Sequence, residues 1–379
     1  MRASGASLVT GPSIQPTMIP IPAAFAARYA QARVKFLEAA ATAGTQIESL
    51  NHPLPGADGE TLALDVALDG DPRAERLLIV SSACHGVEGV CGSGVQVFAL
   101  HDADWRAKAR DAGVAVLYLH ALNPWGFSHG RRVTQENVDL NRNFHDFSRP
   151  LPVNAAYARV HALLLPATWP PDADNRAAMQ AFIARDGLPA WQAAISGGQY
   201  EFADGLFYGG RAPTWSNQAV RQVLTRHAAA ARRVGWIDLH TGLGPNGVGE
   251  RIHADRNDPA ALARARRWWG EQVTSISDGS SSSPVLTGLL WESLRDAAPQ
   301  AEYTGIAIEY GTEPIAEVLD ALRGDHWLAQ HPEAPAALAA SIKARMLKAF
   351  YTDTDAWKGQ VISQARQSMF QAVQGLNRT

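Results

Sequence analysis

Four short apolar runs stand out along the chain. They cover residues 76–83 (RLLIVSSA), 114–119 (VAVLYL), 234–239 (VGWIDL) and 305–309 (GIAIE). Apolar runs of this length with turn residues nearby are typical of buried strands. A weaker alternation of apolar and polar residues at 61–68 predicts one more strand. The pattern therefore predicts a set of strands, most of them buried on both faces.

Segments with helical spacing of apolar residues lie among these runs. We expect helices over residues 23–43, 94–102 and 259–273. Two more helices are expected at the end of the chain, the second after a Thr352-to-Asp355 capping box. Buried strands separated by helices are typical of parallel sheets that are covered on both sides. The sequence thus predicts an α/β fold with a mixed, largely parallel central sheet flanked by helices.

The domain organisation is predicted from local composition. Glycines and prolines interrupt residues 1–20, which predicts a loose N-terminal arm and argues against a signal peptide. Residues 145–230 mix helical and loop sequence with several prolines and predict a helical and loop insertion. We expect residues 21–379 to form a single domain. No apolar stretch approaches the length of about 18 residues that a membrane span needs, so we expect no membrane contact and a cytoplasmic protein.

Charge and cysteine content narrow the classes of partner. Lys and Arg number 34 and Asp and Glu number 37, a net charge of −3, with no block of like charges. This balance argues against a nucleic-acid partner. Cys84 and Cys91 are too few for a disulfide framework. Buried free thiols are the simplest interpretation, although Cys84 could also lie beside a metal. The sequence leaves open whether the protein forms a homo-oligomer.

Polar residues follow the four apolar runs at the point where each predicted strand ends. His85 and Glu88 follow the first, and His240 follows the third, while Glu309 closes the fourth. The second leads through a turn to Arg132 and then to the sequence DLNRNF at 139–144. In open α/β sheets, ligands bind beyond the carboxyl ends of the strands. We therefore expect these polar groups to converge on one site.

Two histidines and a glutamate are the ligand types that a catalytic zinc site uses. His85 and Glu88 are three residues apart, so one turn can aim both at a single point. His240 could supply a third ligand and leave the fourth position open for water. His-x-x-Glu by itself is unspecific, and His85 could instead be a capping or core histidine.

Three further residues have both a catalytic and a plain structural interpretation. Glu309 stands at the end of a buried strand, and burying its carboxylate costs free energy unless the group is paired or has a catalytic role. Near a metal-activated water it can act as general base. Asp139 could accept the second ring N–H of His85, or it could cap a turn. Arg132 could stabilise an oxyanion, or it could be a surface arginine.

Asn141 and Arg142 stand together in a polar loop and are interpreted as anchors for a substrate carboxylate, which arginine binds in bidentate fashion. A serine hydrolase is not supported, because Gly92-Ser93-Gly94 is not a nucleophile elbow with partners in the required order.

The order of these motifs resembles that of the zinc carboxypeptidase superfamily. The resemblance spans about residues 76–312 and is carried by His85-x-x-Glu88, the Asn123-Pro124-x-Gly126-Phe127 turn, Arg132, Asp139-x-Asn141-Arg142-Asn143-Phe144, His240 and Glu309. The spacing is most similar to a bacterial branch and to the aspartoacylase and succinylglutamate desuccinylase relatives. The resemblance implies a zinc-carboxypeptidase-like (phosphorylase/hydrolase-like) fold, with 21–379 as the catalytic domain.

The resemblance also implies roles. One Zn²⁺ ion would be held by His85, Glu88 and His240. Arg132 would polarise the scissile carbonyl, and Glu309 would be the base. Asn141 and Arg142 would grip the carboxylate of a small peptide or acyl amino acid.

The implied function is hydrolysis of an amide bond next to a free carboxylate. Alternatives are an N-acyl amino acid deacylase or esterase with the same site, or a binding protein of the same fold without activity. Arg131 could exchange roles with Arg132. The tyrosine that closes over substrate in digestive relatives cannot be assigned, because Tyr303 and Tyr310 lie too near Glu309.

Overall fold

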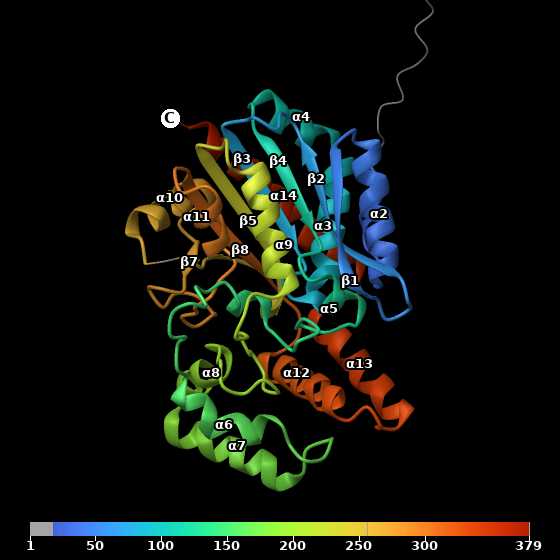
Figure 1. The fold of residues 1–379 in the computed structure, drawn as a ribbon, viewed down its shortest axis with the longest axis vertical. Coiled ribbons are helices and arrows are strands. Elements are labelled where there is room, and N and C mark those ends of the chain that lie inside the picture. Colours follow the sequence, from blue (N-terminus) through green and yellow to red (C-terminus); the bar gives the residue numbers. More distant parts are fainter. Residues whose placement is uncertain (1–17, 256, 379) are drawn as a thin grey trace, which may run out of the picture.

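A mixed eight-stranded sheet runs through the computed structural model, which describes residues 18–255 and 257–378 (Figure 1). Its strand order is β1-β2-β4-β3-β5-β8-β6-β7. The strands are β1 (Gln46–Pro55), β2 (Thr61–Asp69), β3 (Arg76–Ser82), β4 (Ala115–His120), β5 (Arg233–Asn246), β6 (Gly249–His253), β7 (Thr274–Ser275) and β8 (Glu302–Gly311). The central strands β4, β3, β5 and β8 are parallel, and antiparallel pairs lie toward both edges. The predicted mixed, largely parallel sheet is confirmed.

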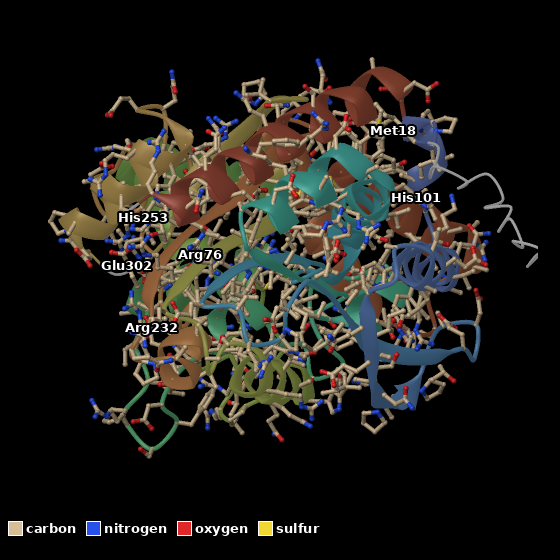
Figure 2. The ribbon with its side chains drawn as sticks, turned by 90° about the horizontal axis from the view of Figure 1, so that it is seen from above. Met18, Arg76, His101, Arg232, His253 and Glu302 are labelled. Carbon is tan, nitrogen blue, oxygen red and sulfur yellow. The ribbon has the colours of Figure 1, made fainter. Side chains whose placement is uncertain are left out.

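The parallel strands begin side by side. Arg76 at the start of β3 pairs with Arg233 in β5, which pairs in turn with Glu302 in β8. Figure 2 shows Arg76, Glu302 and the neighbouring Arg232 on the same side of the molecule. Because the strands run in one direction, their carboxyl ends also meet at one edge, where His240 pairs with Glu309.

Helices cover both faces of the sheet. The helices are α1 (Ile21–Ala24), α2 (Tyr29–Thr42), η1 (Gly86–Glu88), α3 (Gly89–His101), α4 (Ala103–Asp111), α5 (Pro124–Ser128), η2 (Leu140–Arg142), α6 (Ala155–Leu164), α7 (Ala173–Asp186), α8 (Leu188–Ser196), α9 (Trp215–His227), α10 (Pro259–Trp269), α11 (Glu292–Ala297), α12 (Ile315–Gln330), α13 (Ala336–Phe350) and α14 (Asp355–Asn377).

Side chains of the central strands alternate between two cores. On β3, Leu78 and Val80 pack with α2, α3, α4, α10 and α14, whereas Leu77 and Ile79 pack with α9 and α11. In Figure 1, α9 lies in front of the sheet and α14 behind it. The sheet is thus buried on both faces, which explains why its central strands read as continuous apolar runs.

A third core lies below the carboxyl edge of the sheet. It joins residues of α6, α7 and α8 to residues of α12 and α13, and these helices form the lower part of the molecule in Figure 1. Helices α6 to α9 fall within 145–230, the predicted insertion. Val87, directly beside the candidate metal ligands, belongs to the same core.

Four helix predictions were wrong in detail. Helix α3 begins at Gly89 and not at residue 94, and α10 ends at Trp269 and not at residue 273. The helix expected over 23–43 is broken into α1 and α2, because Phe25 adopts an extended conformation and the Lys35 ammonium binds the carbonyls of Ala23 and Phe25 at 2.7 and 2.8 Å. The capping box before the last helix does not involve Thr352. Thr354 caps α14 by accepting the backbone N–H of Trp357 at 3.3 Å.

Most of the predicted N-terminal arm, residues 1–17, lies outside the described residues. Among the helices within 18–255 and 257–378, none is both long and apolar enough to cross a membrane.

Candidate metal centre and active site

The turn after β3 is shaped by a close approach of two backbones. Gly86 and Val87 donate their N–H groups to the carbonyls of Arg132 and Arg131 at 3.1 and 2.9 Å. A Cβ on Gly86 would lie 2.1 Å from the carbonyl carbon of Gly126, so only glycine fits there. The short helix η1 that follows aims His85 and Glu88 toward the end of β5.

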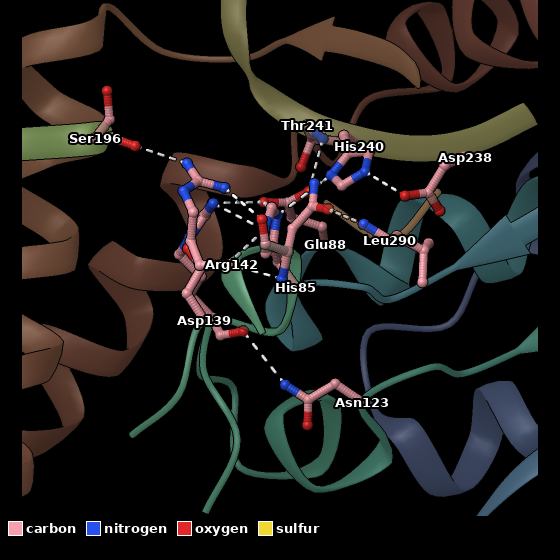
Figure 3. A network of polar contacts seen from close by, with 12 residues as sticks. His85, Glu88, Asn123, Asp139, Arg142, Ser196, Asp238, His240, Thr241 and Leu290 are labelled. Atoms are coloured by element: carbon pink, nitrogen blue, oxygen red, sulfur yellow. Dashed lines mark hydrogen bonds and ion pairs between the residues drawn. The ribbon is translucent and has the colours of Figure 1, made fainter. Parts of the chain in front are cut away.

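Three buried donor atoms meet at this edge of the sheet (Figure 3). Nδ1 of His85 lies 2.8 Å from Oε1 of Glu88, and Nδ1 of His240 lies 3.1 Å from Oε2 of the same carboxylate. The two Nδ1 atoms are 3.2 Å apart. Tetrahedral zinc with bonds near 2.1 Å would hold its ligand atoms about 3.4 Å apart. The donor set therefore fits a zinc-sized ion in both chemistry and spacing.

Each histidine has a carboxylate on its far nitrogen. Nε2 of His240 lies 2.6 Å from Oδ2 of Asp238, and Nε2 of His85 lies 3.3 Å from Oδ1 of Asp139. The Asp238 carboxylate fixes the tautomer of His240 in which Nδ1 is free to bind a metal, whereas Nε2 of His85 is shared between Asp139 and the Arg132 guanidinium. Two imidazole nitrogens and a carboxylate at these separations require a proton or a cation between them. This orientation is the second observation that fits a metal ion.

The charges of the site favour a cation. Burial would raise the pKa of Glu88, but the charge of His85 and hydrogen bonds from His240 and His85 hold that pKa well below its usual range. Burial would lower the pKa of His240, but the carboxylates of Asp238 and Glu88 hold it well above its usual value. A buried pocket with this excess of negative charge attracts a proton or a metal ion.

Glu309 stands in register with His240 on the neighbouring parallel strand. Residues paired in this way lie about 4.8 Å apart and project from the same side of the sheet. Burial and the nearby charge of Glu88 raise the pKa of Glu309 to about 8, against the opposing charges of His240 and Arg132. A carboxyl group with this pKa can exchange a proton near neutral pH.

The structure separates the two adjacent arginines. Arg132 donates from Nη1 to Glu88 at 3.2 Å and from Nε to Asp139 at 3.0 Å, and its Nη2 lies 2.8 Å from Nε2 of His85. Arg131 turns away and donates to the buried carboxylate of Asp325 at 2.8 Å. Of the two, only Arg132 faces the candidate metal ligands, and Arg131 does not take its place.

Asp139 has the capping role that the sequence left open and lies beside His85. It caps η2 by accepting the N–H of Asn141 at 3.0 Å, and it also contacts His85 and Arg132. Burial would raise the pKa of Asp139, but the charges of Arg132 and Arg142 hold it well below its usual value. The carboxylate therefore stays charged between the candidate metal ligands and the arginines.

Arg142 is almost fully buried, at 3% exposure, although it carries a charge. Its Nη1 donates to the carbonyl of Asn141 at 2.8 Å and its Nη2 to that of Ser196 at 2.7 Å (Figure 3). Nε is buried and has no partner among the described residues. An arginine offers five N–H donors, so donors remain for an anion. The side-chain oxygen of Asn141 accepts the N–H of Leu290 at 3.0 Å, which leaves its amide NH₂ as the free end.

Cys84 lies close enough to Asp238 and His240 to complete a second group of three donors. Burial raises the pKa of its thiol well above the usual value, and the charge of Asp238 raises it further. A protonated thiol is a poor metal ligand. Cys84 therefore fits a core thiol better than a ligand.

Several other candidates lie too deep to act. Tyr310 is 0% exposed and donates to the carbonyl of Val361, and Tyr303 is 8% exposed, so neither can close over a substrate. Ser93 and His120 are hydrogen-bonded at 2.9 Å but are 1% and 0% exposed. This Ser-His pair has no access to a substrate.

The sequence profile of the family described as "Protein of unknown function (DUF2817)" matches residues 25–364. The chain belongs to the DUF2817 family. No curated protein matches this DUF2817 chain.

Solved structures similar to this DUF2817 protein include metallocarboxypeptidases, the superfamily that its motifs resemble. Bovine thrombin-activatable fibrinolysis inhibitor, in complex with tick carboxypeptidase inhibitor, is 9% identical; the match covers 93% of this chain and 97% of that one, with a TM-score of 0.49. Carboxypeptidase A from Helicoverpa armigera is 11% identical, with 85% and 73% covered and a TM-score of 0.44. A metallo-carboxypeptidase from Burkholderia cenocepacia is 13% identical, with 84% and 66% covered and a TM-score of 0.39.

The sequence did not assign a role to Asp238. The sequence could have indicated that Asp238 lies beside His240. Residues i and i+2 of a strand project from the same face, and Asp238 stands two residues before His240. Phe207, which lies against two of the site arginines, had no such signal.

Proposed function

We propose that this DUF2817 protein is a hydrolase that binds one zinc ion and cleaves an amide bond next to a free carboxylate. The observation that carries the proposal is the convergence of His85, Glu88 and His240, with Glu309 in register beside His240. His85 and His240 would hold the ion through Nδ1 and Glu88 through its carboxylate. Bound there, zinc supplies Lewis acidity toward the attacking water and the scissile carbonyl.

The remaining steps belong to side chains of this chain. Glu309 takes the proton of the attacking water and later delivers it to the leaving amine. Arg132 is held in place by Asp139 and Glu88 and keeps donors for the carbonyl oxygen as negative charge develops on it. These positions match the roles that the motif resemblance implies.

Substrate binding is assigned to Asn141 and Arg142. Arg142 is fixed by two backbone carbonyls and keeps a buried, unpartnered Nε, an arrangement that a carboxylate would complete. A substrate with this anchor would be a peptide with a free carboxyl terminus or an N-acyl amino acid.

The test combines metal content with paired substrates. We expect purified wild-type protein to bind about one equivalent of zinc and His240→Ala to lose most of it. Zinc-loaded protein should hydrolyse N-acyl dipeptides or N-acyl amino acids with a free carboxylate, and the C-terminal amides of the same compounds much more slowly. Arg142→Ala should raise KM for the acids while leaving KM for the amides nearly unchanged.

The outcomes separate the alternatives. Full zinc content in His240→Ala would remove that residue from the ligand set. Zinc binding without turnover of either substrate class would favour a binding protein of the same fold. Preference for acyl amino acids over dipeptides would identify a deacylase.

A further inference from the structure

Phe207 lies over both arginines of the candidate site. Its ring centroid is 5.0 Å from Cζ of Arg132 and 5.9 Å from Cζ of Arg142. The residue belongs to the loop between α8 and α9 and is 8% exposed. The face of an aromatic ring carries partial negative charge, so it attracts guanidinium groups at such distances. One ring thus contacts the side chain assigned to the scissile carbonyl and the side chain assigned to the carboxylate.

The backbone at this position is held in a conformation that phenylalanine disfavours. Phe207 has φ +53°, in the left-handed region that residues with a Cβ seldom adopt. Hydrogen bonds on both sides hold it there: Gln199 donates its N–H to the carbonyl of Phe207 at 3.2 Å, and Asp139 donates its N–H to that of Tyr208 at 2.7 Å. Such strain persists where the surroundings over-determine the geometry, and it clusters at functional sites. The loop is tied to the same residue that contacts His85 and Arg132.

The charge of Arg142 is less directly compensated than that of Arg132. Burial lowers the pKa of Arg142 and the like charge of Arg132 lowers it further, against the opposing charge of Asp139. Arg132 is paired with the carboxylates of Asp139 and Glu88. Among the described residues, the Arg142 guanidinium donates its hydrogen bonds to the backbone carbonyls of Asn141 and Ser196. The aromatic face adds a favourable interaction with both cations without supplying a carboxylate that would compete with an anionic substrate.

We propose that Phe207 is a positioning residue that holds the Arg132 and Arg142 guanidiniums in the geometry that accepts a carboxylate-bearing substrate. The expected effect on substrate binding rests on the proposed function, whereas the contact of Phe207 with the two arginines does not. It assigns a role in substrate binding to the 145–230 segment, from which Phe207 reaches the site.

The test compares Phe207→Leu, which removes the aromatic face, with Phe207→Tyr, which keeps it. Phe207→Met serves as a second non-aromatic variant if the leucine variant does not fold. Phe202→Leu is the matched control, because Phe202 belongs to the same loop but stacks on His161, with ring centroids 4.2 Å apart. Two quantities are measured. The first is the Kd of an N-acyl amino acid by calorimetry on zinc-loaded protein, with Glu309→Gln added to wild type and to every variant so that the ligand is not cleaved. The second is the side-chain Nε–Hε resonances of Arg132 and Arg142, assigned through their lysine variants.

We expect Phe207→Leu to weaken binding roughly 3- to 10-fold, as loss of a buried cation–π contact implies, and to shift both arginine resonances through loss of the ring current. Phe207→Tyr should bind like wild type, and Phe202→Leu should change neither quantity. Unchanged arginine resonances in Phe207→Leu would overturn the proposal, and so would equal weakening in the tyrosine variant. If wild type binds no carboxylate, the proposed function fails while the resonances still decide the role of Phe207.

Discussion

Glu309 has a local environment that differs from that of an ordinary surface carboxylate. It is partly buried beside His240, and desolvation with the charge of Glu88 raises its pKa to about 8. We expect Glu309→Gln to retain zinc and to lower kcat by about 10²–10⁴-fold, because the amide keeps the shape but cannot accept a proton. Steady-state kinetics with metal analysis checks this. Glu302→Gln, at the other end of β8, is the control; normal turnover in Glu309→Gln would reject the base assignment.

Asp238 holds the ring of His240 from behind. Its Oδ2 lies 2.6 Å from Nε2 of His240, and its Oδ1 accepts the hydroxyl of Ser81 at 2.5 Å. We expect Asp238→Asn to weaken zinc affinity about 10- to 100-fold, since carboxylates that orient a ligating imidazole have effects of this size. Competition with a chromogenic chelator measures the affinity. The exposed Asp111→Asn is the control, and wild-type affinity in Asp238→Asn would contradict the role.

The residues at the strand ends and their convergence could be predicted from the sequence, but not all of their partners could: Asp238 beside His240 was missed. His85, Glu88, His240 and Glu309 are unusual directly after apolar runs, and the structure brings them together. Phe207 reaches the arginines only through a loop with a left-handed residue, which no local pattern encodes.

At the scale of elements, the turn between β3 and α3 depends on its contact with α5. A Cβ on Gly86 would collide with the backbone of Gly126, which cannot yield as a flexible side chain would. We expect Gly86→Ala to lower the free energy of unfolding by about 1–3 kcal/mol, the usual cost of overpacking, and to weaken zinc binding by displacing η1. Urea unfolding of the zinc-free and zinc-loaded forms measures both effects.

Gly359→Ala is the matched control for this prediction. A Cβ on Gly359, within α14, meets no atom within 4 Å, so the alanine should stabilise the protein by up to about 1 kcal/mol through helix propensity. Equal effects of the two substitutions would show that the turn tolerates a side chain.

The buried strands could be predicted because their apolar runs reflect burial on both faces. β1 escaped prediction because it is an edge strand with mostly exposed residues, so it shows no apolar run. α12 also escaped; its buried side includes Arg323, Asp325 and His326, which local hydrophobic spacing does not count as core. Elements whose inward faces are polar become recognisable only with their partners.

At the scale of the whole molecule, a buried ion pair joins the lower helices to a loop of the candidate site. Asp325 of α12 is 1% exposed and accepts hydrogen bonds from Arg131 at 2.8 Å and from Lys343 of α13 at 2.6 Å. Lys343 also donates to the carbonyl of His129 at 3.0 Å. Because Arg131 precedes Arg132, this contact connects the docking of α12 and α13 with the geometry of the site.

Because of the ion pairs of Asp325, we expect the free energy of unfolding to depend on pH. Burial would raise its pKa, but the charges of Arg131 and Lys343 lower it below the unfolded value of about 3.9. The stabilisation is complete above that value and is lost as the pH falls through it toward the lower native pKa. Asp325→Asn removes the charge and leaves two cations without their carboxylate, which should cost about 3 kcal/mol at pH 7.

Urea unfolding at pH 7, 5, 4 and 3.5 tests this dependence. The difference in free energy of unfolding between wild type and Asp325→Asn should stay constant from pH 7 to 5 and shrink below about pH 4, because only the wild-type carboxylate can be protonated. Asp71→Asn, whose side chain is 62% exposed, should follow wild type throughout. If the difference in free energy of unfolding stayed constant down to pH 3.5, Asp325 would contribute through packing and not through its charge. The ion pair with Arg131 would then not be needed to hold α12 against the site.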